Sequence, residues 1–374
     1  MLMLIYESSF VFDMFGFQHQ PGIRSLRIYT MQEAGRERGA NRFLRTMHTI
    51  ACFVGLVGMA GLGSTGTGSN RALAQAAAKP ESPQLVWVDT DIGDDIDDAF
   101  ALGLILRSPE LKVLGVSTAF GDTETRARLV DRFLAATHVQ GIPVTAGVHT
   151  ITDNVMTQAP YALQFPERKH ADGVSALLAE INRHPGQITL IALGPLFNVG
   201  AAIDRDPAAF RKLKRVVMMG GSIDRGYDGK NGPKLTPDAE WNINRDPKDA
   251  GKLFAAGVPV FLAPLDSTQI HLDTKARESI FATGNPLTDQ LTLLYHQWIA
   301  GSWDHTPVPT LFDPVAAAYT FRPELCPMQP MRLEVDDKGF TRKVEGQPNA
   351  QVCLKSDEDA FRALLGERLK VTGK

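Results

Sequence analysis

Short apolar runs alternate with longer amphipathic segments from residue 85 onward. The apolar runs, rich in strand-forming residues, are 85–89, 111–118, 188–193, 215–219 and 258–263. The segments with helical spacing of apolar residues are 97–107, 124–137, 174–183, 247–256 and 274–282. Repeated strand–helix units predict an α/β fold with an open, mostly parallel sheet and helices on both faces.

The C-terminal part of the chain has a different pattern. Residues 331–354 are typical of a small antiparallel add-on to the sheet, and residues 358–369 of a closing helix. No linker, repeat or low-complexity segment interrupts the sequence after residue 84. We therefore expect a single catalytic domain over residues 75–374.

The first 74 residues do not continue this pattern. Four arginines between residues 36 and 45 precede an apolar run at 49–63, and residues 72–74 are Ala-Leu-Ala. A basic stretch, an apolar run and an A-x-A tripeptide follow one another in this order in secretory signal peptides. The sequence predicts a signal or targeting segment over 1–74 and an exported protein. This segment is either removed on export or begins upstream of the real initiator, for which Met31 and Met47 are candidates. The apolar run is shorter than the roughly 18 residues of a membrane span.

Composition narrows the possible functions. The 374 residues include 39 Lys and Arg against 42 Asp and Glu, so the chain lacks the basic excess that binds nucleic acid. With 44% hydrophobic residues, the chain can bury a large core. Three cysteines are too few for a disulfide scaffold. Without residues 1–74, Cys326 and Cys353 remain, either as a pair or as free thiols.

Aspartates are concentrated directly after the first strand. Six of them fall within residues 89–98, in the string D-T-D-I-G-D-D-I-D-D. One or two can cap the following helix, but six carboxylates in one turn repel each other unless a cation compensates them. No Lys or Arg lies between residues 84 and 106. Oxygen-only ligands favour Ca²⁺ or Mg²⁺, although the string does not match an EF-hand loop.

Four further turns carry polar or small residues after strands or before helices. The turn at 193–198 contains Gly-Pro, which frees backbone carbonyls, and the turn at 218–222 contains Gly-Gly. In the string 239–244, Glu240 and Asn242 can present a carboxylate and an amide to one polyol. Asp313 precedes a proline and either caps a helix or joins a site. Ligands of open α/β sheets bind at the carboxyl ends of the strands, where these turns are expected to meet.

Seven strings in this order resemble the inosine–uridine-preferring nucleoside hydrolase family. They lie at 88–99, 116–122, 142–147, 192–198, 217–222, 239–247 and 311–319. The resemblance implies an open α/β fold that hydrolyses the N-glycosidic bond of ribonucleosides to free base and ribose with the help of Ca²⁺. It also implies a small-molecule nucleoside as the substrate and a possible homo-oligomer.

The resemblance also implies roles for individual residues. The metal ligands are Asp91, Asp98, Asp313 and the carbonyl of Leu193. The general base that takes a proton from a calcium-bound water is Asp97, and His170 lies close to the active site as a second catalytic candidate. The substrate contacts are Asp122, Met219, Glu240, Trp241, Asn242 and Phe312.

The chain departs from the commonest family pattern at four places. Two extra residues give the longer motif D-x-G-x-D-x-D-D and leave the role of Asp95 open. Asp122 and Lys234 stand where the family usually has asparagine, and Asn231 is a possible substitute for the second. Phe312 replaces a histidine that is the proposed leaving-group acid in some members. Aromatic residues that could stack on the base are Phe312, Trp241, Trp298 and Trp303.

Two alternatives remain open from the sequence. A haloacid-dehalogenase-like phosphohydrolase also has a D-x-D string after its first strand, but Gly93 and the pair Asp97-Asp98 do not fit its pattern. A non-catalytic secreted binder of calcium or of a ribosyl compound would explain the changes at Asp122, Lys234 and Phe312. The retained carboxylates argue against that binder.

Overall fold

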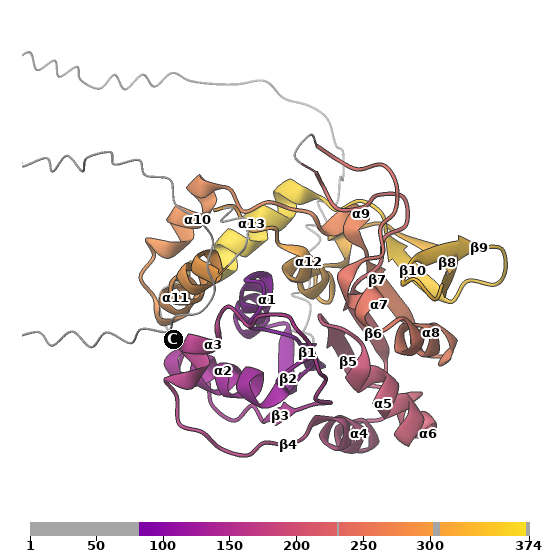
Figure 1. The fold of residues 1–374 in the computed structure, drawn as a ribbon, viewed down its shortest axis with the longest axis horizontal. Coiled ribbons are helices and arrows are strands. Elements are labelled where there is room, and N and C mark those ends of the chain that lie inside the picture. Colours follow the sequence, from indigo (N-terminus) through magenta and orange to yellow (C-terminus); the bar gives the residue numbers. More distant parts are fainter. Residues whose placement is uncertain (1–81, 230–231, 302–306, 372–374) are drawn as a thin grey trace, which may run out of the picture. The chain divides into compact units, whose positions relative to one another are not determined.

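A computed structural model describes residues 82–229, 232–301 and 307–371. These residues belong to one compact unit, 75–374. The predicted signal segment lies outside the described residues. Within the described ranges, ten strands form one sheet in the order β4-β3-β2-β1-β5-β6-β7-β10-β8-β9 (Figure 1).

The strands are β1 (Gln84–Thr90), β2 (Leu111–Thr118), β3 (Val144–Ala146), β4 (Ala171–Asp172), β5 (Thr189–Ala192), β6 (Arg215–Met219), β7 (Val260–Ala263), β8 (Met328–Val335), β9 (Thr341–Val344) and β10 (Ala350–Cys353). The helices are α1 (Asp97–Leu106), α2 (Thr123–Ala136), α3 (Ala159–Leu163), α4 (Gly173–Arg183), α5 (Phe197–Arg205), α6 (Pro207–Phe210), α7 (Trp241–Arg245), α8 (Pro247–Ala255), α9 (Leu265–Thr268), α10 (Thr274–Phe281), α11 (Pro286–Gly301), α12 (Phe312–Tyr319) and α13 (Glu358–Leu369), with a short 3₁₀ helix at Pro323–Leu325.

The order of the strands creates a switch point beside β1. The chain runs outward from β1 through β2 and β3 to β4, then returns to place β5 on the other side of β1. All pairings from β4 to β10 are parallel, and only those of β10 with β8 and of β8 with β9 are antiparallel. Asp89 is in register with Ala192, so β1 and β5 end at the same level. Such a switch point is where open α/β sheets bind ligands.

Side chains of β1 alternate between two hydrophobic cores, one on each face of the sheet. Val86 and Val88 pack with apolar residues of α1, α2, α11, α12 and α13. Trp87 packs with residues of α4, α5, α6 and α8 on the opposite face. The burial of both faces explains why the central strands are continuous apolar runs. The predicted fold class is therefore confirmed.

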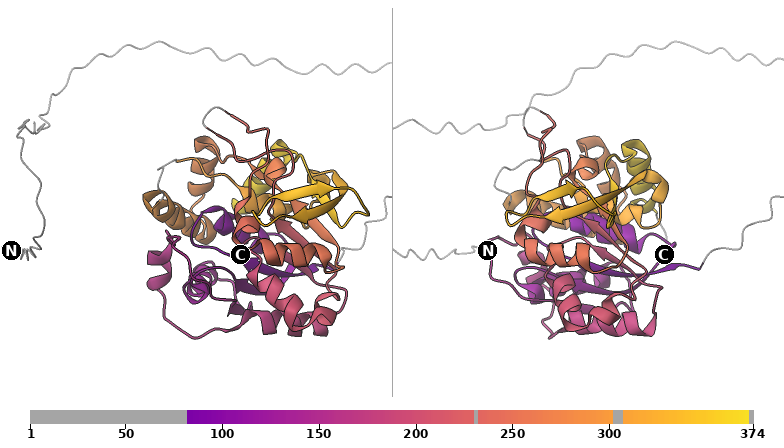
Figure 2. Two further views of the ribbon diagram at one scale, coloured as in Figure 1. Left: turned by 45° about the vertical axis from the view of Figure 1, so that its right-hand side comes forward. Right: turned by 90° about the vertical axis from the view of Figure 1, so that its right-hand side faces the viewer.

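The C-terminal add-on also has the predicted form. Strands β8 and β9 form an antiparallel hairpin at one end of the sheet, drawn in orange-yellow in Figures 1 and 2, and α13 follows β10. Cys326 and Cys353 form a disulfide with a Cα–Cα distance of 5.8 Å, so the paired alternative applies. No helix in the described ranges is long and apolar enough to cross a membrane.

Candidate active site

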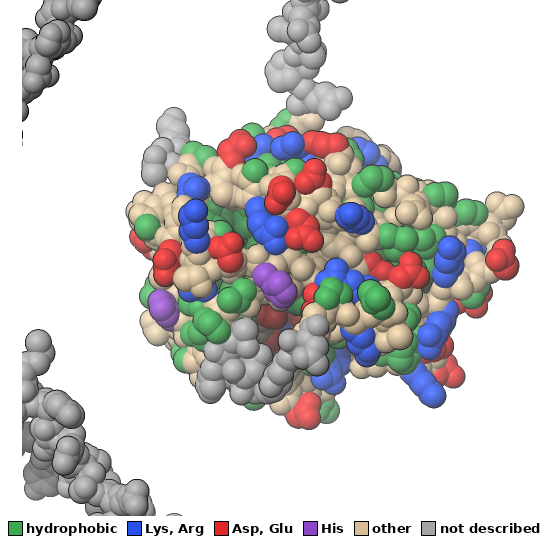
Figure 3. Space-filling view, turned by 90° about the horizontal axis from the view of Figure 1, so that it is seen from above, with side chains coloured by type: hydrophobic (Ala, Val, Ile, Leu, Met, Phe, Trp, Pro, Cys, Tyr) green, Lys and Arg blue, Asp and Glu red, His purple; other side chains and the backbone are tan. Residues whose placement is uncertain are grey.

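A cavity of about 660 Å³ lies at the carboxyl ends of β1, β5 and β6. In the surface view of Figure 3, the face seen from above is hollowed and shows acidic side chains within the hollow. The cavity is lined by ten of the twelve residues to which the family resemblance assigns roles, namely Asp91, Asp97, Asp98, Leu193, Met219, Glu240, Trp241, Asn242, Phe312 and Asp313. The structure thus brings together motifs that are up to 222 positions apart in the sequence (Asp91 to Asp313).

Three buried carboxylates converge at the base of this cavity. Asp97 and Asp98 begin α1, Asp313 lies in the first turn of α12, and one oxygen of each lies within 4.8 Å of the others. The backbone N–H of Asp313 donates to Oδ2 of Asp97 at 3.2 Å. The hydroxyl of Thr90 donates to Asp98. Two helix N-termini therefore deliver the carboxylates to one point, where the positive ends of the helices stabilise negative charge.

The electrostatics of the cluster favour a bound cation. Burial raises the pKa of Asp97, Asp98 and Asp313 well above their usual range, and repulsion between neighbouring carboxylates raises these pKa values further. Burial also raises the pKa of Asp91 to about 7, against the attraction of Arg126. A divalent ion would remove this repulsion, and the oxygen-only donors fit Ca²⁺ or Mg²⁺. The residues present therefore fit the metal that the sequence predicts.

The turn after β5 lies directly against Asp91. A Cβ atom on Gly194 would stand 2.8 Å from Oδ1 of Asp91, which explains the glycine at this position. The preceding residue, Leu193, lines the same cavity, and its carbonyl accepts a hydrogen bond from Nδ2 of Asn242 at 2.9 Å. A carbonyl oxygen has a second lone pair, so Leu193 can still serve as a metal ligand.

Glu240 and Asn242 are held in place by backbone groups. Glu240 is the N-cap of α7, and its carboxylate accepts from the N–H groups of Gly221 at 2.8 Å, Asn242 at 3.0 Å and Ile243 at 3.2 Å. Burial raises the pKa of Glu240, and these three hydrogen bonds partly offset the rise. Asn242 donates to the carbonyls of Leu193 and Met219. Both side chains are therefore fixed before a ligand binds.

Aromatic side chains form another part of the cavity wall. Phe312, Trp241 and Trp298 line it, together with Tyr227, which the sequence motifs do not include. Tyr227 and Phe312 pack edge to face with ring centroids 6.2 Å apart. The guanidinium of Arg245 lies over the Trp241 ring at 3.8 Å. Trp303 and Asn231 lie outside the described residues.

The two extra residues of the aspartate motif, Asp94 and Asp95, also line the cavity. Arg126 of α2 pairs with Asp94 at 2.8 Å and donates to the carbonyls of Asp91 and Ile92. The sequence gives little warning of this buried cation, because Arg126 follows the aspartates by about 30 positions. Arg126 thus compensates one carboxylate of the string and holds the loop between β1 and α1.

The segment 154–158 also binds the loop between β1 and α1. Asn154 donates to the Asp94 carboxylate, and Thr157 donates to the Asp94 carbonyl at 2.7 Å. Gln158 donates to the carbonyl of Asp95 at 2.6 Å. These residues have no strand-end motif to mark them, so sequence reasoning misses them. The longer motif is therefore a loop that is held by several tertiary contacts.

The structure places Asp122 away from the cavity. Asp122 is exposed and caps α2, and its carboxylate accepts from the N–H of Thr125 at 3.1 Å and from the hydroxyl of Thr125 at 2.6 Å. Gly121, with φ of 64°, turns the chain directly into this helix. The expected contact between Asp122 and substrate is therefore not supported. Lys234 is also absent from the lining and pairs with Asp238.

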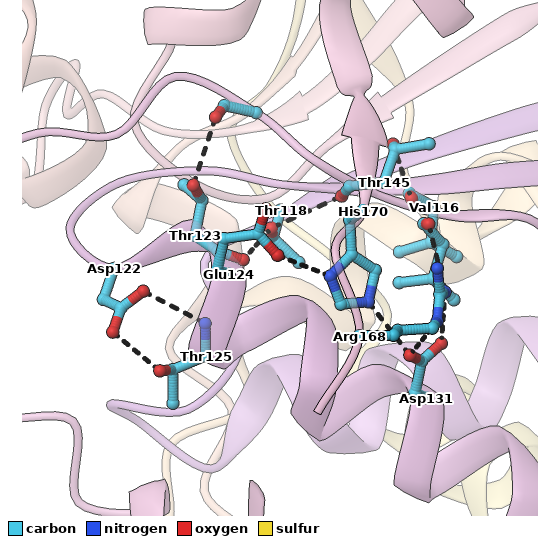
Figure 4. A network of polar contacts seen from close by, with 12 residues as sticks. Val116, Thr118, Asp122, Thr123, Glu124, Thr125, Asp131, Thr145, Arg168 and His170 are labelled. Carbon is cyan, nitrogen blue, oxygen red and sulfur yellow. Dashed lines mark hydrogen bonds and ion pairs between the residues drawn. The ribbon is translucent and has the colours of Figure 1, made fainter. Parts of the chain in front are cut away.

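His170 likewise lies outside the cavity lining. Figure 4 shows its ring between two carboxylates of α2, with Nδ1 at 2.6 Å from Glu124 and Nε2 at 2.9 Å from Asp131. Arg168 forms a two-pronged contact with Asp131, at 2.6 and 2.7 Å. The His170 side chain is 1% exposed. The expected catalytic role is not supported, because this network connects the segment before β4 to α2.

Replacing His170 with alanine is expected to lower the free energy of unfolding by about 2 to 3 kcal/mol and to leave kcat unchanged. Stability falls because the substitution removes a buried side chain that contacts two carboxylates. The kcat stays the same because His170 does not line the cavity. Urea denaturation and ribose release measure the two effects, with His184→Ala at a more exposed ion pair as the control. A large loss of kcat with unchanged stability would restore the catalytic assignment.

Without a bound cation, the protein is expected to become less stable as the pH rises from 5.5 to 8.5. Asp91 has a pKa of about 7 and buried Asp89 a pKa of about 6, both above the unfolded value near 4. Their stabilising contribution is therefore complete below about pH 4 and is lost as the pH rises through these values. Thermal denaturation in a chelator measures the trend, and added Ca²⁺ should raise Tm. A Tm that increases with pH and does not change when Ca²⁺ is added would contradict this account.

Comparison with known proteins agrees with the fold. The family model described as inosine-uridine preferring nucleoside hydrolase matches residues 86–363. The pyrimidine-specific ribonucleoside hydrolase RihA of Citrobacter koseri is 32% identical over 317 residues, which cover 76% of this chain and 97% of the relative. RihA of Salmonella arizonae is also 32% identical, over 77% of this chain and 99% of its own length.

Solved structures show the same architecture. A plant nucleoside hydrolase, the PpNRh1 enzyme, superposes with a TM-score of 0.67 at 25% identity, covering 78% of this chain and all of its own. The purine-preferring ribonucleoside hydrolase of Gardnerella vaginalis shares the fold, with a TM-score of 0.65 at 22% identity over 77% of this chain and 98% of its own.

These relatives define the class of the protein as an enzyme that hydrolyses N-glycosyl compounds. The chain belongs to the inosine-uridine preferring nucleoside hydrolase family. This membership argues against the alternative of a haloacid-dehalogenase-like phosphohydrolase. It also agrees with the buried aspartate cluster, because the family is metal-dependent.

Proposed function

We propose that this protein hydrolyses the N-glycosidic bond of ribonucleosides to free base and ribose, with Ca²⁺ as its metal. The observation that carries the proposal is the meeting of the buried carboxylates Asp97, Asp98 and Asp313 with Glu240 and Asn242 in one cavity. The carboxylate cluster suits a hard cation, and the fixed carboxylate and amide suit the hydroxyls of a sugar. Neither feature alone distinguishes an enzyme from a binder, but family membership favours the enzyme.

The proposed metal ligands are the carboxylates of Asp91, Asp98 and Asp313 and the carbonyl of Leu193. When bound, Ca²⁺ supplies a Lewis acid that lowers the pKa of water and a point of attachment for ribose hydroxyls. The three carboxylates are buried, and Leu193 lies on the turn that packs against Asp91. These contacts keep the ligands ordered.

Asp97 is the proposed general base. It accepts a proton from the attacking water as the bond from that oxygen to C1′ forms and the bond from C1′ to the base nitrogen breaks. Asp91 is a second candidate, because it lies outside the group of three converging carboxylates. Separate substitution of Asp97 and Asp91 tests which of the two is the general base and which is the metal ligand.

Glu240 and Asn242 are proposed to act on the sugar. The transition state resembles a ribosyl oxocarbenium ion, and the fixed carboxylate of Glu240 stabilises its positive charge. Asn242 is anchored through its amide nitrogen, so its oxygen is available to accept a hydrogen bond from a ribose hydroxyl. Because both groups are held by the backbone, little reorganisation is needed on binding.

Export of the protein is proposed as well. The signal-like order of residues 1–74 motivates it, and the disulfide between Cys326 and Cys353 supports it, because disulfides persist mainly in oxidising compartments. Fractionation of cells that express the full chain tests this proposal. Recovery only with the cytosolic fraction would contradict it. The homo-oligomer implied by the resemblance stays a prediction.

A panel of uridine, cytidine, inosine, adenosine and guanosine tests the proposed reaction and its base preference. We expect ribose release from at least one member of the panel. Preference for purines would support base stacking on Phe312, whereas preference for pyrimidines would match the specificity of the pyrimidine-specific RihA relatives. No release from any nucleoside, by protein that binds Ca²⁺, would favour the non-catalytic binder.

A further inference from the structure

Tyr227 is a cavity residue without an assigned role. It lies between β6 and α7 and lines the cavity beside Glu240 and Phe312. Hydrogen bonds fix the segment that contains Tyr227. The Asp266 carboxylate accepts from the N–H groups of Ile223 at 2.9 Å and Asp224 at 2.7 Å. The N–H of Tyr227 itself donates to Asp238 at 3.0 Å. The ring is therefore held in a fixed position at the wall.

The hydroxyl of Tyr227 has one fixed partner and one unused capacity. It accepts a hydrogen bond at 2.9 Å from the backbone N–H of Trp241, the first residue of α7. Because the oxygen acts as acceptor in this contact, the hydroxyl hydrogen is directed elsewhere, and no side chain or carbonyl in the described ranges accepts it. An unpaired donor on the wall of a cavity is a group that a ligand can satisfy.

The neighbour of Tyr227 makes this donor significant. The ring of Tyr227 packs edge to face on its neighbour Phe312, with an interplanar angle of 81°. Phe312 stands where the family resemblance leads us to expect a histidine that acts on the leaving group, and a phenyl ring cannot donate a hydrogen bond. The structure thus packs a residue that carries a hydroxyl donor against the position from which the expected donor is missing.

The surroundings of Tyr227 keep its hydroxyl protonated. Burial raises the pKa of Tyr227, and the nearby carboxylates of Glu240, Asp238 and Asp97 raise that pKa further. A phenol in such a place is a poor source of protons but a permanent hydrogen-bond donor. It can stabilise negative charge that develops on a departing group without changing its own charge.

We propose that the Tyr227 hydroxyl is a catalytic residue that donates a hydrogen bond to the departing nucleobase. This inference rests on the proposed function. As the bond from C1′ to nitrogen breaks, its electron pair remains with the base, and the hydrogen bond from Tyr227 stabilises the resulting negative charge. Tyr227 keeps its proton throughout. The water that attacks C1′ gives one proton to the general base, and the departing base takes one proton from solvent.

Tyr227→Phe tests the proposal on two kinds of substrate. A nucleoside hydrolysed by the wild type needs help for its leaving base, whereas p-nitrophenyl β-ribofuranoside releases a phenolate that is already a stable anion. We expect kcat for the nucleoside to fall about 10²-fold, the typical effect of losing one preorganised donor. We expect little change for the p-nitrophenyl substrate. The phenylalanine keeps the ring contact with Phe312.

Tyr319→Phe is the matched control. It also removes a buried hydroxyl, which donates to the Cys326 carbonyl at 3.0 Å, and Tyr319 does not line the cavity. We expect wild-type activity on both substrates from this variant. Titration calorimetry with Ca²⁺ should give the same affinity for the wild type and both variants, since none of these hydroxyls is a proposed ligand.

Each outcome supports or overturns the role of Tyr227. An equal loss on both substrates would show that the hydroxyl only holds α7 and would overturn it, as would no loss on either substrate. Tyr227→His keeps a ring N–H donor and should retain more nucleoside turnover than Tyr227→Phe, so equal turnover would also count against the role. A wild type that hydrolyses neither substrate would instead refute the proposed function.

Discussion

Replacing Asp97 with asparagine is expected to lower kcat for ribonucleosides by about 10²- to 10⁴-fold, the usual contribution of a general base. Asparagine has nearly the same shape, so it retains an oxygen that can accept from the backbone N–H of Asp313. It cannot take a proton from water at neutral pH. Steady-state ribose release measures the loss, and calorimetry should show that Ca²⁺ still binds.

The comparison with Asp91→Asn makes this prediction specific. Asp91 is a proposed ligand, so its substitution should weaken Ca²⁺ binding, and its activity should recover in part at high Ca²⁺. Activity of Asp97→Asn should not recover in this way. The opposite pattern, with weak binding for Asp97→Asn and intact binding for Asp91→Asn, would exchange the roles of the two residues. Near-normal turnover by Asp97→Asn would eliminate it as the base.

Replacing Asp98 with asparagine is expected to weaken Ca²⁺ affinity by at least about 100-fold. Loss of a group that only orients a ligand typically costs 10- to 100-fold in affinity, and loss of the ligand's own charge should cost no less. Asp98 is buried, accepts a hydrogen bond from Thr90 and lies within the converging group of carboxylates. Calorimetric titration of chelator-treated protein with Ca²⁺ measures the affinity.

Asp273→Asn is a suitable control for Asp98→Asn. Asp273 caps α10 through the N–H of Ala276 and is not among the residues that line the cavity. The Asp273→Asn substitution also removes one negative charge from the protein but should leave the affinity for Ca²⁺ unchanged. A weak effect of Asp98→Asn, similar to that of the control, would be inconsistent with its assignment as a ligand.

The parallel core of the fold is predictable because its strands are buried on both faces. The continuous apolar runs that became β1, β2, β5, β6 and β7 are visible in the sequence for this reason. Strands β3 and β4, at one end of the sheet, span only three and two residues, too short for a recognisable pattern. The pairing order, and with it the switch point beside β1, depends on contacts that local patterns do not contain.

The candidate site was predictable where its residues belong to strand-end motifs. Asp91, Leu193 and Met219 each lie at the carboxyl end of a parallel strand, so the sheet itself brings them together. Arg126 and Tyr227 belong to a helix and a long connection, and only tertiary packing delivers them to the aspartate loop and the cavity.

The two predicted site residues that do not line the cavity, Asp122 and His170, differ from the others for one physical reason. A polar side chain beside a strand can either face a ligand or bind a neighbouring helix, and the local sequence is the same in both cases. Asp122 caps α2, and His170 pairs with carboxylates of that helix. Spatial neighbours, rather than residue types, decide between the two roles.

The most direct test of the account is ribose release from uridine and inosine before chelation, after chelation and after Ca²⁺ is returned. The account predicts release that stops in the chelator and resumes with Ca²⁺, since the buried carboxylates need a cation to form a working site. Release that continues unchanged in the chelator would contradict the proposed role of the metal. Absence of release from a protein that calorimetry shows to bind Ca²⁺ would contradict the proposed hydrolysis itself.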